Sequence, residues 1–436
     1  MAQDLSPAQR TLTVGVLGAG TVGSQVIRLL TEQADDFAAR SGARLEITGV
    51  AVRDVNAPRD FAVPQDLLTD DATAVATGND LVIELIGGIE PARTLILAAF
   101  KAGASVITGN KALIAAHGPE LYTAAAAAGT DFYYEAAVAG AIPVVYALRE
   151  SMAGDRVTSV LGIVNGTTNY ILDEMSTKGL SFETALATAQ ELGYAEADPT
   201  ADVEGLDAAS KAAIVASLAF HSDFTIDDVH TEGITAITAD DVAAADADGY
   251  VIKLLAICER EGEDGVNIRV NPTLIPRQHP LAGVHGAFNA VFVEAENAGE
   301  LMFYGPGAGG APTASAVLGD FVSLARRLVL GGPGVPETSH AQLHATSLDN
   351  VISRYSVGVL VEDRLGVLAN ITRILAEHGI SVDSLRQSAS HEGAAQIRMV
   401  THSAKDSDLR RAIAVIDALD TVREVNSVIR VESEKH

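Results

Sequence analysis

Tryptophan is missing from the 436 residues, and cysteine occurs only once, as Cys258. A single thiol excludes an intrachain disulfide framework and is typical of proteins from a reducing compartment. The paired Cys/His spacing of a zinc site is missing as well. Cys258 lies in VIKLLAICER, an apolar run that looks helical, so we expect a buried core thiol.

Basic residues are scarce, because 30 Lys and Arg stand against 57 Asp and Glu, a formal net charge of −27. Such a field repels phosphate backbones and anionic lipids, which argues against nucleic-acid and membrane-surface functions. No stretch approaches the roughly 20 apolar residues of a membrane span. The first residues, MAQDLSPAQR, lack the basic and apolar regions of a signal peptide. We therefore expect a cytoplasmic protein.

A glycine-rich motif follows the first strand that the sequence predicts. A β-rich run at 11–17 leads into GAGTVG at 18–23, and a helical pattern follows. In such a strand–helix turn the first glycine makes the turn, the second lets the backbone approach a pyrophosphate, and the third allows close helix packing. The helix N-terminus offers N–H groups to the phosphates. The predicted dinucleotide contacts are Gly18, Gly20, Thr21, Val22 and Gly23.

The second expected strand, at 45–52, ends in Arg53 and Asp54. An acid at this position binds a ribose 2′-OH, whereas an arginine suits a 2′-phosphate. Arg53, helped by Arg59, therefore favours NADP(H), with NAD(H) possible. An ordinary surface arginine is the alternative.

Two further apolar runs, at 81–86 and 105–108, are typical of buried parallel strands, and GNK at 109–111 follows the second. Ligands of open α/β sheets bind at the carboxyl ends of the strands. Lys111 is therefore expected in the crevice between cofactor and substrate. A solvated lysine is the alternative.

Glu135 lies where a strand predicted at 131–136 runs into an apolar, glycine-containing bend. A buried carboxylate must be paired, hydrogen-bonded or bound to a cation. Beside the backbone carbonyls of the bend it would form an oxygen-rich cage for a hard cation. A hydrogen-bonded structural glutamate is equally compatible with the sequence.

The stretch at 189–211, AQELGYAEADPTADVEGLDAASK, is crowded with acids and ends in Lys211. Asp207 lies four residues before Lys211, so a helix would place both side chains on one face. An exposed ion pair on a solvated helix is the simplest interpretation. The Asp-Pro pair and Gly205, however, break the stretch into a turn and a new helix, so that the acids converge.

The spacing A-x3-G-Y-A-x2-D-P-x2-D-V-x-G-x-D-x3-K over this stretch resembles the signature of homoserine dehydrogenases. The resemblance covers essentially the whole chain. It implies the reversible NAD(P)H-dependent reduction of L-aspartate 4-semialdehyde to L-homoserine, in threonine, methionine and isoleucine biosynthesis. The other agreeing segments are VLGAGTVG at 16–23, TGNKALIA at 108–115, YEAAVAGAIPVV at 134–145, VNGTTNYIL at 164–172 and YGPGAGGAPTASAV at 304–317.

The resemblance also implies functions for single residues. Lys211 is the expected proton donor to the aldehyde oxygen, and Lys111 lies near the same oxygen. Glu196 and Asp207 suit the substrate's ammonium group or, for Asp207, the positioning of Lys211. The remaining implied contacts are Asp202 for the substrate, Gly193 and Gly309 for the cofactor, and Glu135 with the carbonyls of Val138, Gly140 and Ile142 for a structural sodium ion.

A glycine- and proline-rich linker precedes the C-terminal part, where apolar residues alternate at 355–361 as in a half-buried strand. The turn EDRLGVL and a helix follow, and the pattern βαββαβ resembles an ACT domain. Such domains commonly bind amino acids between copies, which implies a homo-oligomer, dimer or tetramer, with threonine as effector. A plain ferredoxin-like dimerisation module is the alternative. The last predicted elements are strands at 380–388, 394–402 and 422–431 and a helix at 406–419.

The predicted fold class is α/β, with a Rossmann-type parallel sheet, an α+β substrate and dimerisation domain, and the ferredoxin-like ACT domain. Two other functions compete: a dehydrogenase of another small hydroxy or amino acid, and a non-catalytic NADPH and amino-acid sensor. Only the signature at 189–211 argues against the first, and the two lysines argue against the second. The predicted limits are 1–134 for the NAD(P)-binding domain with a returning helix near 312–330, 135–311 for the substrate domain, 331–350 for the linker and 351–436 for the ACT domain.

Overall fold

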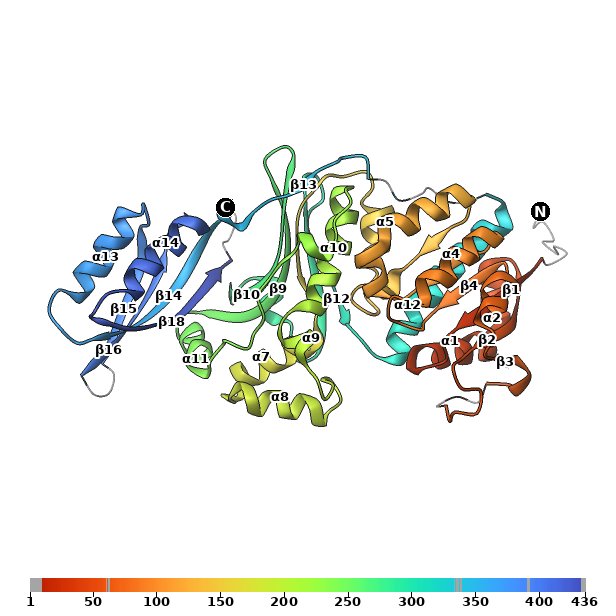
Figure 1. The fold of residues 1–436 in the computed structure, drawn as a ribbon, viewed down its shortest axis with the longest axis horizontal. Coiled ribbons are helices and arrows are strands. Elements are labelled where there is room, and N and C mark those ends of the chain that lie inside the picture. Colours follow the sequence, from red (N-terminus) through yellow and green to blue (C-terminus); the bar gives the residue numbers. More distant parts are fainter. Residues whose placement is uncertain are drawn as a thin grey trace, which may run out of the picture. The chain divides into compact units, whose positions relative to one another are not determined.

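A computed structural model describes residues 10–59, 61, 63–332, 334, 337, 339–389 and 393–432, and Figure 1 labels its helices and strands. The chain folds into two compact units. These units do not follow the limits predicted from the sequence, which remain a prediction; residues 333, 335, 336 and 338 of the predicted linker lie outside the described residues. Unit 1 comprises Met1–Val164, Ser210–Val229 and Phe288–Leu343, and unit 2 comprises Asn165–Ala209, His230–Ala287 and His344–His436.

A six-stranded parallel sheet forms the centre of unit 1, in the order β3-β2-β1-β4-β5-β6. The strand order reverses between β1 and β4, which is where open α/β sheets bind their ligands. β4 is buried throughout, as a strand covered on both faces must be. The strands are β1 (Thr11–Leu17), β2 (Arg44–Ala51), β3 (Leu68–Thr69), β4 (Leu81–Glu84), β5 (Ser105–Thr108) and β6 (Phe132–Tyr133).

Helices cover this sheet, and one of them comes from much later in the sequence. Helix α12 (Gly310–Leu330) buries Val317, Phe321 and Leu324 in the same core as Val14 of β1 and Val26 of α1. The chain therefore returns to the nucleotide-type sheet after leaving it. The other helices here are α1 (Thr21–Glu32), α2 (Ala34–Ser41), α3 (Ala72–Thr77), α4 (Ala92–Ala102) and α5 (Lys111–Ala128).

The rest of unit 1 contains an antiparallel group, β7 (Val157–Ile163), β11 (Phe288–Ala295) and β12 (Gly299–Pro306). The strand predicted at 131–136 is shorter than expected. β6 ends at Tyr133, and a 3-10 turn at Glu135–Ala137 leads into α6 (Val144–Tyr146) and a π-helical turn at Ala147–Ser151. The prediction was wrong beyond Tyr133 because hydrogen bonds to the Glu135 carboxylate curl this segment, and an apolar pattern does not reveal them.

In unit 2 a long antiparallel hairpin of β9 (Tyr250–Glu261) and β10 (Gly265–Pro276) carries helices around it. Cys258 is buried as expected, but it lies in β9 and not in a helix. The middle of β9 is buried on both faces, so its sequence lacks the alternation that distinguishes a strand from a helix. The neighbouring elements are α7 (Gly166–Lys178), α8 (Phe182–Glu191), α9 (Thr200–Val203), β8 (His230–Thr231), α11 (Ala239–Ala247) and β13 (His344–Ala345); α10 (Leu206–Phe220) begins in unit 2 and continues in unit 1.

The C-terminal module has the predicted βαββαβ order, with strands arranged β18-β14-β16-β15. Both helices bury apolar side chains, such as Ile371 and Ile416, against Val359 of the sheet. β18 also pairs in parallel with β10, so the module continues the sheet of the β9–β10 hairpin. Its elements are β14 (Ile352–Glu362), α13 (Val367–Glu377), β15 (Val382–Ala389), β16 (Ala394–Thr401), β17 (Ala404–Lys405), α14 (Asp406–Asp417) and β18 (Val422–Val431).

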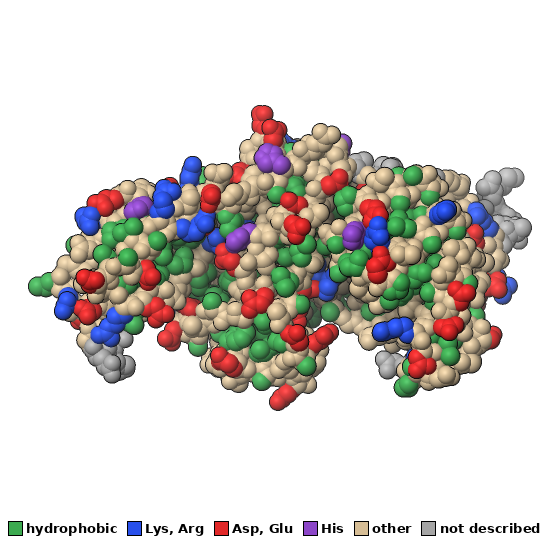
Figure 2. Space-filling view, viewed as in Figure 1, with side chains coloured by type: hydrophobic (Ala, Val, Ile, Leu, Met, Phe, Trp, Pro, Cys, Tyr) green, Lys and Arg blue, Asp and Glu red, His purple; other side chains and the backbone are tan. Residues whose placement is uncertain are grey.

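The surface reflects the acidic composition. Figure 2 shows Asp and Glu side chains spread over the visible face, interspersed with fewer basic ones. Across the described part of the chain, every helix is too short or too polar to pass through a lipid bilayer.

Candidate active site

The glycine turn between β1 and α1 uses its three glycines differently. A side chain on Gly18, which has a φ of +100°, would lie 2.7 Å from the Leu85 carbonyl oxygen. One on Gly23 would overlap the Gly18 carbonyl. A side chain on Gly20, by contrast, would meet nothing within 4 Å. Gly18 and Gly23 are therefore required by the fold, whereas Gly20 leaves open space in front of the first N–H groups of α1 at Thr21 and Val22.

The start of α12 lies against this turn. A side chain on Gly310 would lie 3.1 Å from the Thr21 carbonyl oxygen, and Gly309 directly precedes it with a φ of +114°. The structure thus brings Gly309 beside the helix N-terminus at which the sequence predicts the phosphates. The distance in sequence between the two segments hides this neighbourhood until the chain is folded.

The two arginines predicted near the ribose have different surroundings. Arg59 donates hydrogen bonds to the carbonyl oxygens of Asp54 and Ala57, at 2.5 and 2.8 Å. It therefore holds its own loop together. Arg53 follows the end of β2 and is exposed, so its side chain is the better placed of the two for a 2′-phosphate.

A buried acid that was not predicted from the sequence forms hydrogen bonds at the carboxyl ends of β4 and β5. Glu84 is fully buried at the end of β4. Its carboxylate accepts hydrogen bonds from the Ile86 amide at 2.7 Å and from the Thr108 hydroxyl at 2.5 Å. Asn110 donates to the Gly88 carbonyl at 2.6 Å and caps α5 through the Leu113 amide. One charged residue within the apolar run LVIELI was the available signal.

Lys111 is the first residue of α5, directly after that cap, and its side chain is exposed. The Glu84 and Asn110 hydrogen bonds fix the loop before it and the first turn of α5. Lys111 therefore lies at the carboxyl end of β5, as predicted, on a rigid support.

Glu135 is buried, and each of its carboxylate oxygens accepts a backbone hydrogen bond. Oε1 binds the Val145 amide at 2.9 Å and Oε2 the Tyr146 amide at 2.7 Å. The Glu135 amide in turn donates to Asp320 of α12 at 2.8 Å. Burial raises the pKa of Glu135 to about 7, and burial together with the Glu135 charge raises that of Asp320 to about 8. Glu135 is therefore a buried, hydrogen-bonded glutamate, which is one of the two alternatives that the sequence left open.

The bend after Glu135 is where the sequence predicts a cation. Ala139 and Gly140 both have left-handed backbones, with φ of 54° and 60°, which turn the chain sharply. In the described ranges no group of three or more His, Cys, Asp or Glu side chains could hold a metal ion. A cation here fits only if the carbonyls of Val138, Gly140 and Ile142 supply most of the ligands, with the second lone pairs of the carboxylate.

A single amide joins two of the predicted substrate acids. The Asn165 Nδ2 atom donates to Asp202 at 2.7 Å and to Asp207 at 2.8 Å. Its Oδ1 atom accepts the Thr168 amide at 2.8 Å and so caps α7. Gly205, with a φ of 81°, makes the turn between α9 and α10 that brings the two acids together. Asn165 was missed, although its place directly after a strand and before a helix was visible.

Gly193 and Glu196 lie in the exposed loop after α8. The Thr167 hydroxyl donates to the Tyr194 carbonyl at 2.7 Å, which ties this loop to α7. Within the described structure, the hydrogen bond to Glu196 comes from Gln190 and reaches its backbone carbonyl, at 3.0 Å. The Asn165 amide thus joins two of the three predicted acids, and Glu196 is not part of that pair.

Lys211 lies one turn beyond Asp207 on α10. Each of these residues is only 8% exposed, which excludes an exposed ion pair on a solvated helix. The Lys211 ammonium donates to the Val164 carbonyl at 2.6 Å, directly after β7. A buried lysine held by a hydrogen bond at the end of a strand is suited to transferring a proton.

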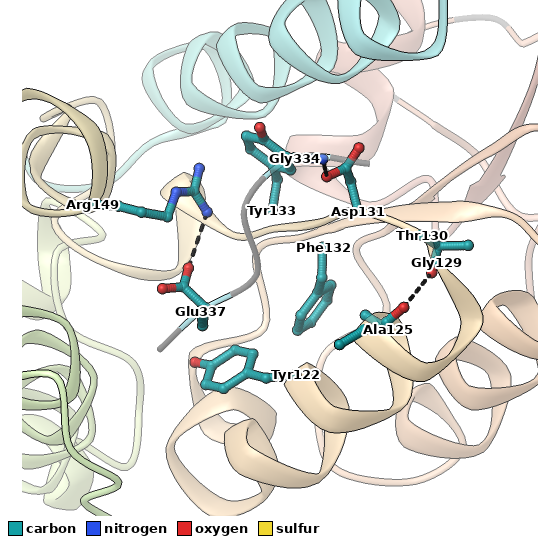
Figure 3. A pocket seen from close by; sticks show the side chains of 11 residues that line it. Tyr122, Ala125, Gly129, Thr130, Asp131, Phe132, Tyr133, Arg149, Gly334 and Glu337 are labelled. Atoms are coloured by element: carbon teal, nitrogen blue, oxygen red, sulfur yellow. Dashed lines mark hydrogen bonds and ion pairs between the residues drawn. The ribbon is translucent and has the colours of Figure 1, made fainter. Parts of the chain in front are cut away.

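A separate small cavity, of about 100 Å³, lies in unit 1 beside α5 and β6 (Figure 3). Arg149 reaches across it to Glu337 at 3.2 Å and lies over the Tyr133 ring. The Gly334 amide donates to Asp131 at 2.6 Å. These contacts hold Gly334 and Glu337 of unit 1 against β6 and the π-helical turn, and the cavity is lined by none of the predicted site residues.

Comparison with known proteins agrees with these features. A family model described as homoserine dehydrogenase matches residues 143–322, its NAD-binding domain matches 18–135, and an ACT domain model matches 355–421. The chain is 55% identical over 425 residues to the homoserine dehydrogenase of Corynebacterium glutamicum, covering 96% of this chain and 95% of that one. It is 51% identical over 435 residues to that of Mycobacterium tuberculosis, covering 97% and 98%. A solved homoserine dehydrogenase from Thiobacillus denitrificans has a TM-score of 0.91 at 41% identity, covering 97% and 99%.

Replacing Gly20 by Ala should weaken NADPH binding by about tenfold or more, because the new methyl group occupies the space in front of the helix N-terminus. The thermal unfolding midpoint without cofactor should stay at the wild-type value. Fluorescence titration with NADPH and a thermal melt measure the two effects. Gly23→Ala is the matched comparison and should lose stability as well. Wild-type NADPH affinity in Gly20→Ala would remove this turn from the phosphate site.

Replacing Asp320 by Asn should flatten the dependence of stability on pH. The pKa of Asp320 is raised from its ordinary 3.8 to about 8, so the folded chain holds a proton that the unfolded chain releases. The corresponding stability is present below about pH 4 and is lost as the pH rises toward 8. Urea unfolding midpoints of the wild type should therefore fall more steeply between pH 5 and 8 than those of Asp320→Asn. Equal slopes, with exposed Asp35→Asn as control, would contradict this.

Proposed function

The chain belongs to the homoserine dehydrogenase family, and from that premise we propose that Lys211, Lys111 and the acids joined by Asn165 carry the reduction of L-aspartate 4-semialdehyde to L-homoserine. The observation that supports this most is the burial of Lys211 one helical turn from Asp207. A buried ammonium and a buried carboxylate on one short helical segment are costly unless both have partners. Proton transfer by Lys211 and substrate binding by Asp207 would account for the presence of both charged groups at this position.

The reduction needs a hydride at the aldehyde carbon and a proton at its oxygen. When bound, NADPH supplies the hydride. The Lys211 ammonium gives the proton as negative charge develops on the oxygen, and its hydrogen bond to the Val164 carbonyl orients it. The Lys111 ammonium stabilises the same charge electrostatically. In the reverse direction neutral Lys211 takes the hydroxyl proton back.

Asp202 and Asp207 bind the substrate's ammonium group in this proposal. Asn165 donates to one oxygen of each carboxylate and holds the pair in place before the substrate arrives. Each carboxylate can accept several hydrogen bonds, so an ammonium group can still bind both. Glu196 and Gly193, on the exposed loop, are proposed to contact the substrate and the nicotinamide end of the cofactor.

The cofactor proposed is NADP(H), with NAD(H) accepted less well. The position of Arg53 supports this preference. Arg53 is exposed and lies just beyond the end of β2, the strand that pairs with β1, and β1 leads into the glycine turn. The sodium ion proposed at the Glu135 bend would be structural and held mainly by backbone carbonyls. A cytoplasmic location and a dimer or tetramer remain predictions from the sequence.

Regulation is proposed to act through the ACT domain, with threonine as the amino-acid effector. The family match at 355–421 supports an amino-acid-binding module. Loss of inhibition by threonine in a chain without this module, with catalysis retained, is the expected behaviour.

Replacing Lys211 by Met should lower kcat for aspartate semialdehyde reduction by about 100-fold or more, because the proton donor is removed while the buried volume is kept. NADPH affinity and the unfolding midpoint should change little. Stopped-flow NADPH oxidation measures the rate, and the exposed Lys101→Met is the control. Turnover at the wild-type rate in a folded Lys211→Met protein would show that the donor is another group.

Replacing Arg53 by Asp should raise KM for NADPH by about tenfold or more and change KM for NADH little, because only NADPH carries the 2′-phosphate. Steady-state kinetics with both cofactors measure the ratio. Arg59→Asp is the comparison; it should disturb the loop and affect both cofactors similarly. An equal effect of Arg53→Asp on both cofactors would place Arg53 outside the phosphate site.

A further inference from the structure

Arg430, near the end of β18, is the centre of a charge cluster inside unit 2. Its guanidinium donates to both carboxylate oxygens of Glu232, at 2.9 and 3.1 Å, and to Asp406 at 2.8 Å. Tyr355 donates to the same Asp406 oxygen at 3.0 Å. The Arg430 side chain is 11% exposed and that of Asp406 is 3% exposed. Arg430 therefore links β14, β18 and α14 of the C-terminal module to one carboxylate outside it.

The backbone of Glu232 is fixed by hydrogen bonds to the β9–β10 hairpin. Glu232 follows β8, which pairs with β10, and its amide donates to the Val270 carbonyl at 2.7 Å. Although burial opposes ionisation, the hydrogen bond from His230 and the charge of Arg430 lower the pKa of Glu232 to about 2. Glu232 is therefore ionised throughout the physiological range, and its charge-assisted contact with Arg430 runs from the single Nη1 atom to both carboxylate oxygens.

The segment that carries Glu232 packs directly on the turn between the substrate acids. The Ile234 amide donates to the Val203 carbonyl at 2.8 Å. A side chain on Gly233 would overlap that carbonyl, and one on Gly205 would lie 3.4 Å from the Glu232 carbonyl oxygen. Residues 203–205 join α9, which carries Asp202, to α10, which carries Asp207. No side chain separates the two backbones at Gly233.

We propose that Glu232 is a positioning residue through which Arg430 of the C-terminal module sets the position of the substrate acids Asp202 and Asp207. This inference rests on the proposed binding of the substrate ammonium by those acids. Close-packed backbones transmit a displacement instead of absorbing it. An amino acid that binds the module and moves β18 or α14 changes how Arg430 is shared between Glu232 and Asp406. The β8 segment then shifts the turn at 203–205, and with it the geometry of the two acids.

The module makes further ion pairs with the rest of unit 2, and one of them provides a matched control. Arg386 of β15 lies 3.1 Å from Asp248, which follows α11. Asp248→Asn and Glu232→Gln each replace an acid by its amide and each remove one ion pair with an arginine of the module. Only Glu232 belongs to the segment that packs on residues 203–205.

The test measures kcat, KM for aspartate semialdehyde, KM for NADPH and inhibition by threonine in the full-length wild type, Glu232→Gln and Asp248→Asn. Glu232→Gln should raise KM for aspartate semialdehyde about fivefold or more and weaken threonine inhibition by a similar factor, with KM for NADPH unchanged. Arg430→Lys keeps the charge and loses the planar guanidinium that contacts Glu232 through Nη1 and Asp406 through Nη2, so its KM should fall between those of the wild type and Glu232→Gln. Asp248→Asn should match the wild type.

Three results would overturn the inference. A wild-type KM for aspartate semialdehyde in Glu232→Gln is the first. The second is an equal rise of KM for aspartate semialdehyde in Asp248→Asn. The third is a general destabilisation of Glu232→Gln, seen as a loss of kcat and of affinity for both substrates together with a lowered unfolding midpoint. A wild-type enzyme that does not reduce aspartate semialdehyde would refute the proposed function itself. A wild type that reduces it but ignores threonine would refute the effector only, because the change in KM is measured without threonine.

Discussion

The hydrogen bonds from one Asn165 nitrogen to Asp202 and Asp207 are the constraint around which the candidate substrate site is arranged. Two carboxylates this close to the same atom repel each other, and the amide hydrogens offset that repulsion. Asp207 is buried and Asp202 is half-buried, and a pair of acids held together by a neutral donor is suited to binding a cationic group. The helix cap by Asn165, the Gly205 turn and the contact with the β8 segment all maintain this arrangement.

Buried acids also fix loops at the six-stranded parallel sheet of unit 1. Glu84 and Glu135 each accept backbone N–H groups at a point where a strand ends, and each thereby fixes the loop that carries candidate site residues. Asp320 extends this to α12, because it accepts the Glu135 amide. Burying a carboxylate is costly unless it is hydrogen-bonded. These loops are therefore held by directional bonds, which apolar packing alone does not provide.

Besides the ion pairs of Arg386 with Asp248 and of Arg398 with Asp241, the C-terminal module is joined to the rest of unit 2 by two contacts of different kinds. The pairing of β18 with β10 is a backbone contact that most sequences could make. The contact of Arg430 with Glu232 and Asp406 depends on particular side chains. The first makes the module part of a continuous sheet, and the second gives it a specific, charge-dependent connection to the segment that packs on residues 203–205, between the candidate substrate acids.

The sequence by itself determined the element types, the glycine turn and the family, because these follow from local periodicity and from a long, specific spacing of residues. It failed where short-range patterns carry no information: at β9, which is buried on both faces, and after Tyr133, where hydrogen bonds to Glu135 curl the chain. It also missed Glu84, Asn165 and Asp320, whose partners are 24, 42 and 185 residues away. Only the tertiary structure decided that Asp207 and Lys211 are buried, that one amide joins two acids and that Arg430 reaches Glu232, because each depends on segments that meet only after folding.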